Sequence, residues 1–221
     1  KDFSLMSGIM AIISSSLAVV FSLSACNPFK NDDKSDNSLA AALFLTTPVT
    51  IRMQLMAGSS TFGCSSAATT FGTTSTNSTL QDMRFFVSGV NLIKADGSRV
   101  PVTLSTDTWQ DGSGGVALLD FEDKTGSCAG AGTTDTNTSL RGSIPVFAGS
   151  SFTGVEFTLG VPFSLNHLDS TIRPSPYNIS GMFWNWAGGY KFMKAEITQG
   201  NASSFHLGSV NNNGAGTACD R

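Results

Sequence analysis

Apolar and polar residues alternate along several short stretches of the chain. Between residues 49 and 55 every second residue is apolar, from Val49 to Leu55, and the residues between them are polar. A period of two places the apolar side chains on one face of a β-strand, so the pattern predicts a half-buried strand. Further short apolar runs that are typical of strands occur at residues 83–94, 116–121, 140–146, 155–159, 190–198 and 205–207.

The connections between these runs have the composition of turns and loops. Asp96 and Gly97 precede a new apolar alternation, and both readily adopt the positive φ angles of a tight hairpin turn. Residues 58–77 are mostly Gly, Ser, Thr and Ala around Cys64, which predicts a loop held by that cysteine. No stretch repeats apolar residues at helical spacing. We therefore predict an all-β fold, an antiparallel β-sandwich or irregular barrel with long Gly/Ser/Thr-rich loops.

The first 26 residues differ from the rest of the chain. Residues 9–23 form an apolar run that ends in Leu23-Ser24-Ala25-Cys26, which resembles a bacterial lipobox. A membrane-spanning helix needs roughly 20 apolar residues, whereas this run is shorter and contains serines at 14–16. We expect a lipoprotein signal peptide at 1–26 with lipidation at Cys26, a flexible linker at 27–47 and a β domain at 48–221.

Composition narrows the function further. The chain has 221 residues, of which 40% are hydrophobic, so one domain with one sizeable core is expected. Thirteen basic and 16 acidic residues give a net charge of -3 without a basic cluster, which argues against a nucleic-acid partner.

The cysteines of the predicted mature protein are odd in number. Export to an oxidising compartment permits disulfides. Without Cys26, three cysteines remain: Cys64, Cys128 and Cys219. One thiol is then free or metal-binding, or a partner lies beyond Arg221.

The stretch 159–191 is the best place for chemistry. It contains His167, and the only other histidine of the sequence, His206, follows after one more predicted strand. Neutral imidazole is a good ligand for copper and zinc, although a surface or core role is the alternative for each histidine. A third donor is required, and we consider Met182 or Met193 as thioether, Asp169 as carboxylate, or a modified aromatic residue. Asn166 or Asp169 is suited to orienting an imidazole ring.

Two tryptophans lie in the same stretch. Trp184 and Trp186 occupy alternate positions, so both can face the core as an aromatic slab. The functional alternatives are a stacking platform for a sugar and an oxidisable indole beside a metal. The sequence contains no G-x-S-x-G, H-E-x-x-H, C-x-x-C-H or P-loop motif. We therefore expect a binding protein rather than an enzyme, with a hydrolase that uses His167, Asp169 and a serine as a minor alternative.

An ordered set of motifs resembles the MbnP-like family, also called metallo-mystery pair four-Cys motif proteins. The resemblance spans most of residues 49–221. The motifs are Phe85-Phe86-Val87-Ser88, Trp109-Gln110, residues 117–122, Gly160-Val161-Pro162-Phe163, Asn166-His167, Pro174-Ser175-Pro176, Met182-Phe183-Trp184-Asn185-Trp186, Gly189-Tyr190-Lys191-Phe192 and His206-Leu207-Gly208-Ser209.

This resemblance implies an exported copper-associated protein. It also implies a partner, a MauG-like dihaem cytochrome c peroxidase homologue, that oxidises a tryptophan to kynurenine. Carried over by motif, His167 and His206 become copper ligands, and the oxidised indole is Trp184 or Trp186, with Trp109 in reserve. The chain departs from the four-cysteine pattern, because residues 210–214 intervene after Ser209 before Cys219.

Two functions from different classes follow from these observations. The first is a copper-binding lipoprotein of the periplasm or cell surface, which serves copper uptake or homeostasis without turnover. The second is a structural or adhesive surface lipoprotein whose aromatic loop binds a glycan or a protein. Copper in the purified protein supports the first function. Metal-free protein with glycan affinity supports the second.

Overall fold

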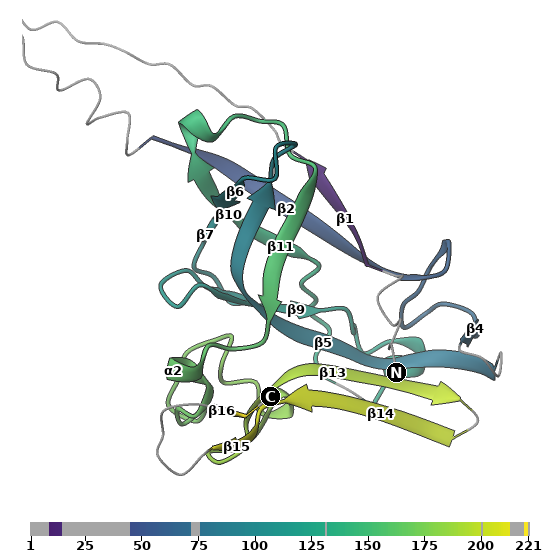
Figure 1. Cartoon of the computed structure of the whole chain (residues 1–221). Coiled ribbons are helices and arrows are strands. Elements are labelled where there is room, and N and C mark those ends of the chain that lie inside the picture. Colours follow the sequence, from purple (N-terminus) through teal and green to yellow (C-terminus); the bar gives the residue numbers. More distant parts are fainter. Residues whose placement is uncertain are drawn as a thin grey trace, which may run out of the picture.

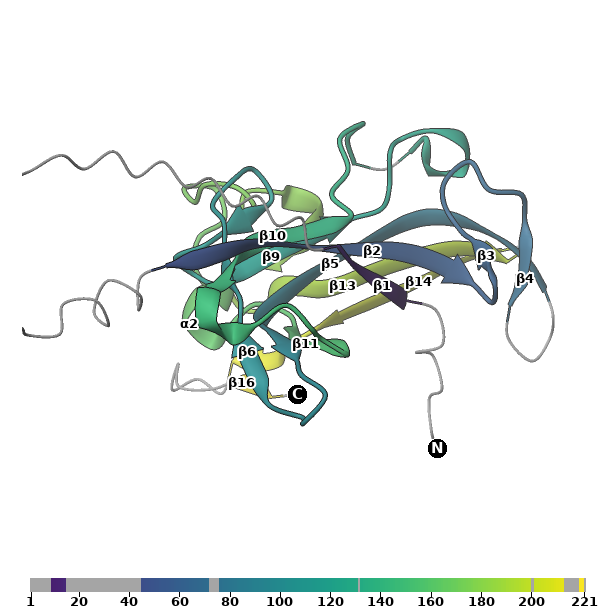
Figure 2. The same cartoon turned by 90° about the horizontal axis from the view of Figure 1, so that it is seen from above.

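The computed structural model describes residues 9–14, 45–71, 76–130, 132–199, 201–212 and 219–220. Figure 1 shows that regular structure in these segments is almost entirely β-strand, arranged in two antiparallel sheets and one short ribbon. The view from above in Figure 2 shows β2 and β10 of the smaller sheet lying across β5, β9 and β13 of the larger one. The predicted all-β sandwich is confirmed.

The smaller sheet has five strands in the order β1-β2-β10-β7, with β3 paired to β2. Their bounds are Ile9–Ser14 (β1), Thr46–Ala57 (β2), Ser60–Thr61 (β3), Thr103–Leu104 (β7) and Ser139–Pro145 (β10). The alternating run at 49–55 forms the centre of β2, as predicted.

The larger sheet has nine strands, and β5 is its spine, because β5 pairs with β4, β6, β9, β11 and β13. The bounds are Thr69–Phe71 (β4), Thr76–Ile93 (β5), Arg99–Pro101 (β6), Gln110–Asp111 (β8), Val116–Asp120 (β9), Gly154–Leu159 (β11), Phe183–Asn185 (β12), Gly189–Gln199 (β13) and Asn201–Gly208 (β14).

Helical structure in the described residues is limited to single turns, and a ribbon follows the larger sheet. The helical turns are Gly126–Cys128 (η1), Val146–Ala148 (η2), Phe163–Asn166 (α2) and Ser180–Met182 (η3). The ribbon pairs Val210–Asn212 (β15) with Cys219–Asp220 (β16). No helix of the described residues is long and apolar enough to cross a bilayer.

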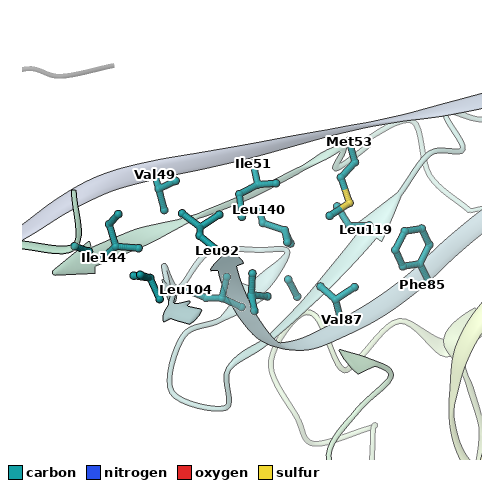
Figure 3. Packing of buried hydrophobic residues seen from close by; sticks show 14 residues of the cluster. Val49, Ile51, Met53, Phe85, Val87, Leu92, Leu104, Leu119, Leu140 and Ile144 are labelled. Carbon is teal, nitrogen blue, oxygen red and sulfur yellow. The ribbon is translucent and has the colours of Figure 1, made fainter. Parts of the chain in front are cut away.

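The main core lies between the two sheets (Figure 3). From β2, Val49, Ile51 and Met53 point into it, whereas Arg52 is exposed, so the period-two pattern does separate a core face from an outer face. Phe85 and Val87 of β5 approach these residues from the larger sheet. Burial of this apolar surface is the main stabilising contribution to the sandwich.

The outer face of the larger sheet carries a second apolar cluster. Phe86 of β5 and Leu118 of β9 face outward and are completely buried beneath Tyr177 and Met182, which belong to the segment that follows β11. Tyr190 of β13 joins the same cluster and packs edge-on against Phe86, with ring centroids 5.4 Å apart. The segment 160–188 therefore covers the outer face of the sheet at one end.

The local predictions hold where turn chemistry decides them. The Asp96-Gly97 turn joins β5 to β6, with a hydrogen bond from the N–H of Gly97 to the carbonyl of Lys94.

The region around Cys64 is only partly a loop. Cys64 forms a disulfide with Cys128, and their Cα atoms are 5.2 Å apart. The prediction of a plain loop at 58–77 is wrong at β3 and β4, because β2 and β5 supply pairing partners for these short strands.

The predicted N-terminal segments lie mostly outside the described residues. Of the predicted signal peptide, the structure describes 9–14, which pair with β2 as β1; Cys26 and residues 27–44 are not among the described residues. Thr46 and Thr47, at the end of the predicted linker, belong to β2. The side chain of Cys219 also lies outside the described part.

Candidate functional site

Asn166, at the end of α2, joins three segments that are distant in sequence. Its side chain is completely buried. Its Oδ1 accepts a hydrogen bond from the N–H of Tyr190 at 2.8 Å, and its Nδ2 donates to Oγ of Ser209 at 3.0 Å. Gly189 has a positive φ of 69°, and a Cβ atom there would lie 2.5 Å from Nδ2 of Asn166, so the contact requires glycine. The start of β13 and the end of β14 are thereby fixed to α2.

His167 follows Asn166 directly and contacts the neighbouring hairpin. Its Nδ1 lies 2.8 Å from the backbone oxygen of Trp186. A carbonyl oxygen only accepts, so Nδ1 carries the hydrogen and Nε2 of the neutral ring carries the lone pair. Nε2 lies 3.3 Å from Nδ2 of Asn166, and the ring of Phe163 packs edge-on at 5.7 Å. The imidazole is thus held in one orientation at the surface of the loop.

Trp184, on β12, rests on the end of β14. A Cβ atom at Gly208 would lie 2.2 Å from ring atom Cζ3 of Trp184, so glycine is needed for this close approach. The turn after β12 is fixed by Asn185, whose Oδ1 accepts from the N–H groups of Ala187 and Gly188 at 2.9 and 2.8 Å. The indole of Trp184 therefore lies against the strand that carries His206, two residues before Gly208.

His206, on β14, is bound to a carboxylate. Its Nε2 lies 2.8 Å from Oε1 of Glu196 on β13, and an ionised carboxylate only accepts. The second oxygen of Glu196 lies 3.3 Å from Nζ of Lys194. Lys194 in turn contacts the buried carboxylate of Asp82 on β5 at 2.6 Å. His206 is thus the outer member of a chain of polar contacts that crosses three strands.

Further buried charged side chains lie next to this chain of contacts, on β5 and β9. The guanidinium of Arg84 donates from Nε to Oδ1 of Asp82 at 2.8 Å. Desolvation by burial raises the pKa of Asp120, which lies across from Arg84 on β9, to about 7, although the N–H of Glu122 and the charge of Arg84 act in the opposite direction. Burial also raises the pKa of Glu122. The outer face of the larger sheet is therefore apolar at one end and ionic towards the other.

The other predicted donors lie in different surroundings. Met182 is completely buried in the outer apolar cluster. Met193 packs against the inter-sheet core, whereas its neighbour Lys194 pairs with His206 on the outer face. Asp169 is exposed and accepts hydrogen bonds from the hydroxyl and N–H of Thr171, which lower its pKa. The described residues contain no group of three or more His, Cys, Asp or Glu side chains that could hold a metal.

The three tryptophans differ in exposure. Trp186 is 70% exposed and Trp184 is 41% exposed, so neither forms a buried slab. Trp109 is partly buried against the outer apolar cluster. Other exposed large apolar side chains of the same segment are Phe163, Leu168 and Ile172. A surface hollow beside β2 contains none of the predicted site residues; Arg52, Met53, Gln54, Leu55, Thr61, Phe62, Phe121 and Thr138 line it.

Sequence reasoning missed the partners that hold the two histidines. Asn166 was expected to orient a ring, and it does lie against His167. Glu196 and Ser209 were not singled out, because their partners come from other segments. The one local signal for Ser209 is its place at the end of the His-Leu-Gly-Ser motif. For Glu196, no pattern within its own strand indicates that it meets His206.

Comparisons with known proteins identify the family of the chain. The family model of MbnP matches residues 46–221. The solved structure of MbnP from Methylosinus trichosporium matches with a TM-score of 0.62 and 27% sequence identity, over 79% of this chain and 68% of that chain. A search of curated protein sequences found no match. Because the family model covers most of the chain, this protein belongs to the MbnP family.

Proposed function

We propose that this protein is an exported copper-binding protein that serves copper uptake or homeostasis and carries out no turnover. His167 and His206 bind one copper ion in this proposal. The supporting observation is the joining of two segments: Asn166 binds Ser209, and Trp184 lies on Gly208. These contacts bring the loop that carries His167 to the end of the strand that carries His206.

The chemistry of the two imidazoles fits copper. Imidazole nitrogen is a borderline ligand that copper binds well, and each ring is oriented by an acceptor on its other nitrogen. Nε2 of His167 and Nδ1 of His206 are the nitrogens that carry lone pairs when the rings are neutral. Copper at Nε2 of His167 would replace the contact of this nitrogen with Nδ2 of Asn166. Because protons compete for these nitrogens, copper binding should weaken in acid.

The third donor comes from the aromatic hairpin in this proposal. An unmodified indole has no basic nitrogen, whereas kynurenine has an aryl amine and a ketone that can bind a metal. Trp184 and Trp186 are the exposed indoles of this hairpin, and the family resemblance implies an external oxidant, the MauG-like dihaem partner. Asp169, which is exposed, remains an alternative donor, whereas Met182 is completely buried among apolar side chains. A lipid anchor at Cys26 would hold the protein at the periplasmic or outer cell surface.

Copper titration of the metal-free protein tests the proposal. Wild type should bind one copper ion per chain, and His167→Ala and His206→Ala should each abolish stoichiometric binding. Asn178→Ala, at an exposed position, is a control that should bind like wild type. Thermal unfolding of each variant checks that the fold is retained. The two-histidine site is wrong if both histidine variants keep stoichiometric binding.

The exposed aromatic surface supports a second candidate function. Trp186 and Trp184 present flat apolar rings to solvent, together with the exposed Leu168 and Ile172. Such rings can stack on a sugar or pack against a protein. This alternative predicts glycan or protein binding by metal-free protein that Trp186→Ala abolishes. Binding that persists in this variant, or that is absent from wild type, contradicts it.

A further inference from the structure

Three neighbouring strands place four charged side chains and one histidine in a row on the outer face of the larger sheet. Lys194 of β13 pairs with Arg84 of β5 on one side and with His206 of β14 on the other. Glu196 lies two residues further along β13 and pairs with Asp82. Directly paired residues of antiparallel strands, and residues two apart in one strand, share a face. The five side chains therefore point to the same side of the sheet.

Two contacts in this row hold the carboxylate of Glu196 from two sides. One carboxylate oxygen of Glu196 lies 2.8 Å from Nε2 of His206, and the other lies 3.3 Å from Nζ of Lys194. Lys194 is itself held at 2.6 Å by the fully buried carboxylate of Asp82. Only 14% of the Lys194 side chain and 24% of the Glu196 side chain are exposed, so solvent screens the contact less than at an open surface.

We propose that Glu196 is a positioning residue that sets the tautomer of His206. By accepting the hydrogen on Nε2, it places the lone pair of the neutral ring on Nδ1 and makes Nδ1 the copper-binding nitrogen. This step rests on the proposed copper site and adds the identity of the ligating atom. His167 has the opposite arrangement, because the carbonyl of Trp186 engages its Nδ1.

Glu196→Gln gives a sharp test because Lys194 can only donate hydrogen bonds. The amide oxygen should turn to Lys194, and the amide NH₂ group should then face His206. That group donates, so Nε2 must accept and the ring hydrogen moves to Nδ1. Nitrogen NMR of metal-free protein labelled with ¹⁵N-histidine reads the tautomer of the neutral ring directly. We expect hydrogen on Nε2 in wild type and on Nδ1 in the variant.

Copper titration of the same samples gives a second readout. Affinity should fall roughly 10- to 100-fold in Glu196→Gln, the usual effect of losing the partner of a ligating histidine. Glu156→Gln is a matched control, because Glu156 forms an exposed ion pair with Arg99 on another strand and should change neither readout. Lys194→Met should retain hydrogen on Nε2, because the Glu196 carboxylate still accepts from His206.

The outcomes separate this inference from the proposed function. Hydrogen on Nδ1 and not on Nε2 of the neutral His206 ring in metal-free wild type overturns the inference, whether or not copper binds. An unchanged tautomer in folded Glu196→Gln also overturns it. If wild type binds no copper but shows the expected tautomers, the copper proposal fails while the assignment of Glu196 stands. Thermal unfolding confirms that each variant is folded before its spectrum is interpreted.

Discussion

At the scale of single residues, the least expected feature is the buried carboxyl group of Asp120 on the outer face of the larger sheet. Asp120 is only 2% exposed and lies across from Arg84 in the sheet. Desolvation raises its pKa to about 7 in spite of the nearby guanidinium. A carboxyl group that prefers its neutral form in the folded protein links stability to pH.

Asp120→Asn tests this link. In the unfolded chain the carboxyl group ionises near its ordinary pKa of 3.8, whereas in the folded protein it keeps its proton up to about pH 7. Wild-type stability should therefore fall as pH rises through this window and then level off. The variant cannot ionise at this position, so its free energy of unfolding relative to that of wild type should increase by at most roughly 4 kcal/mol between the two pH limits. Urea unfolding of both proteins at several pH values measures this difference in the free energy of unfolding. A difference that does not change with pH would refute the prediction.

Gly208 tests the contact beneath Trp184. In Gly208→Ala the added Cβ atom would lie 2.2 Å from the indole, so Trp184 must move away from β14. We expect stronger quenching of tryptophan fluorescence by iodide and weaker copper binding. Gly130→Ala is the matched control, because a Cβ atom there has no neighbour within 4 Å. Identical quenching in both variants would show that the contact is absent in solution.

At the scale of elements, the β12–β13 hairpin carries both exposed indoles and contacts His167. Asn185 fixes its turn, Trp184 rests on β14, and the backbone of Trp186 orients His167. The contact of Asn166 with Tyr190 holds α2 against the start of β13, and β13 itself pairs with β5. A covalent change in either indole would therefore occur beside a histidine that the hairpin already holds.

The modification is predicted from the resemblance and the exposure of the two indoles. Protein isolated from its native host should carry a mass gain on the peptide that contains Trp184 and Trp186. Protein made without the dihaem partner should lack it, because the sequence has no haem-attachment motif of its own. Peptide mapping by mass spectrometry measures this. Two unmodified indoles in native material would leave copper, if bound, to the histidines and another donor.

At the scale of the whole molecule, the sandwich uses the two faces of its larger sheet differently. The inner face is apolar and packs against the smaller sheet (Figure 3). The outer face carries the second apolar cluster, the row of polar side chains from β5, β13 and β14, and the segment with both exposed indoles. The disulfide between Cys64 and Cys128 belongs to a third apolar cluster, which also contains Leu80 of β5 and packs against Ile197 of β13.

Membrane attachment is a prediction for the whole protein. Cys26→Ser should move the protein from the detergent phase to the aqueous phase, because the lipobox cysteine is the expected site of acylation. Phase partitioning after expression in a bacterial host with its lipoprotein pathway measures the effect. Cys64 is unsuitable as a control because it is in the disulfide, so Ser24→Ala, which keeps a small residue in the motif, serves instead. Unchanged partitioning of Cys26→Ser would refute anchoring at this residue.

Much of the fold was predictable because strands and turns are local. The alternation at 49–55 and the Asp96-Gly97 turn depend on neighbouring residues, and both appear as expected in β2 and in the β5–β6 hairpin. The loop at 58–77 was predicted less well, since β3 and β4 exist through pairing with strands elsewhere. Composition also identified the stretch that contains His167 and the exposed tryptophans.

The sequence by itself determined the strand periodicity, the turn positions, the all-β class and the motifs that carry the family resemblance. Only the tertiary structure decided that Cys64 pairs with Cys128, that Asn166 meets Ser209 and that His206 meets Glu196. The physical reason is the separation along the chain over which each interaction acts. Backbone preferences act between adjacent residues, whereas register, burial and hydrogen-bond partners depend on which distant segments the folded core brings together.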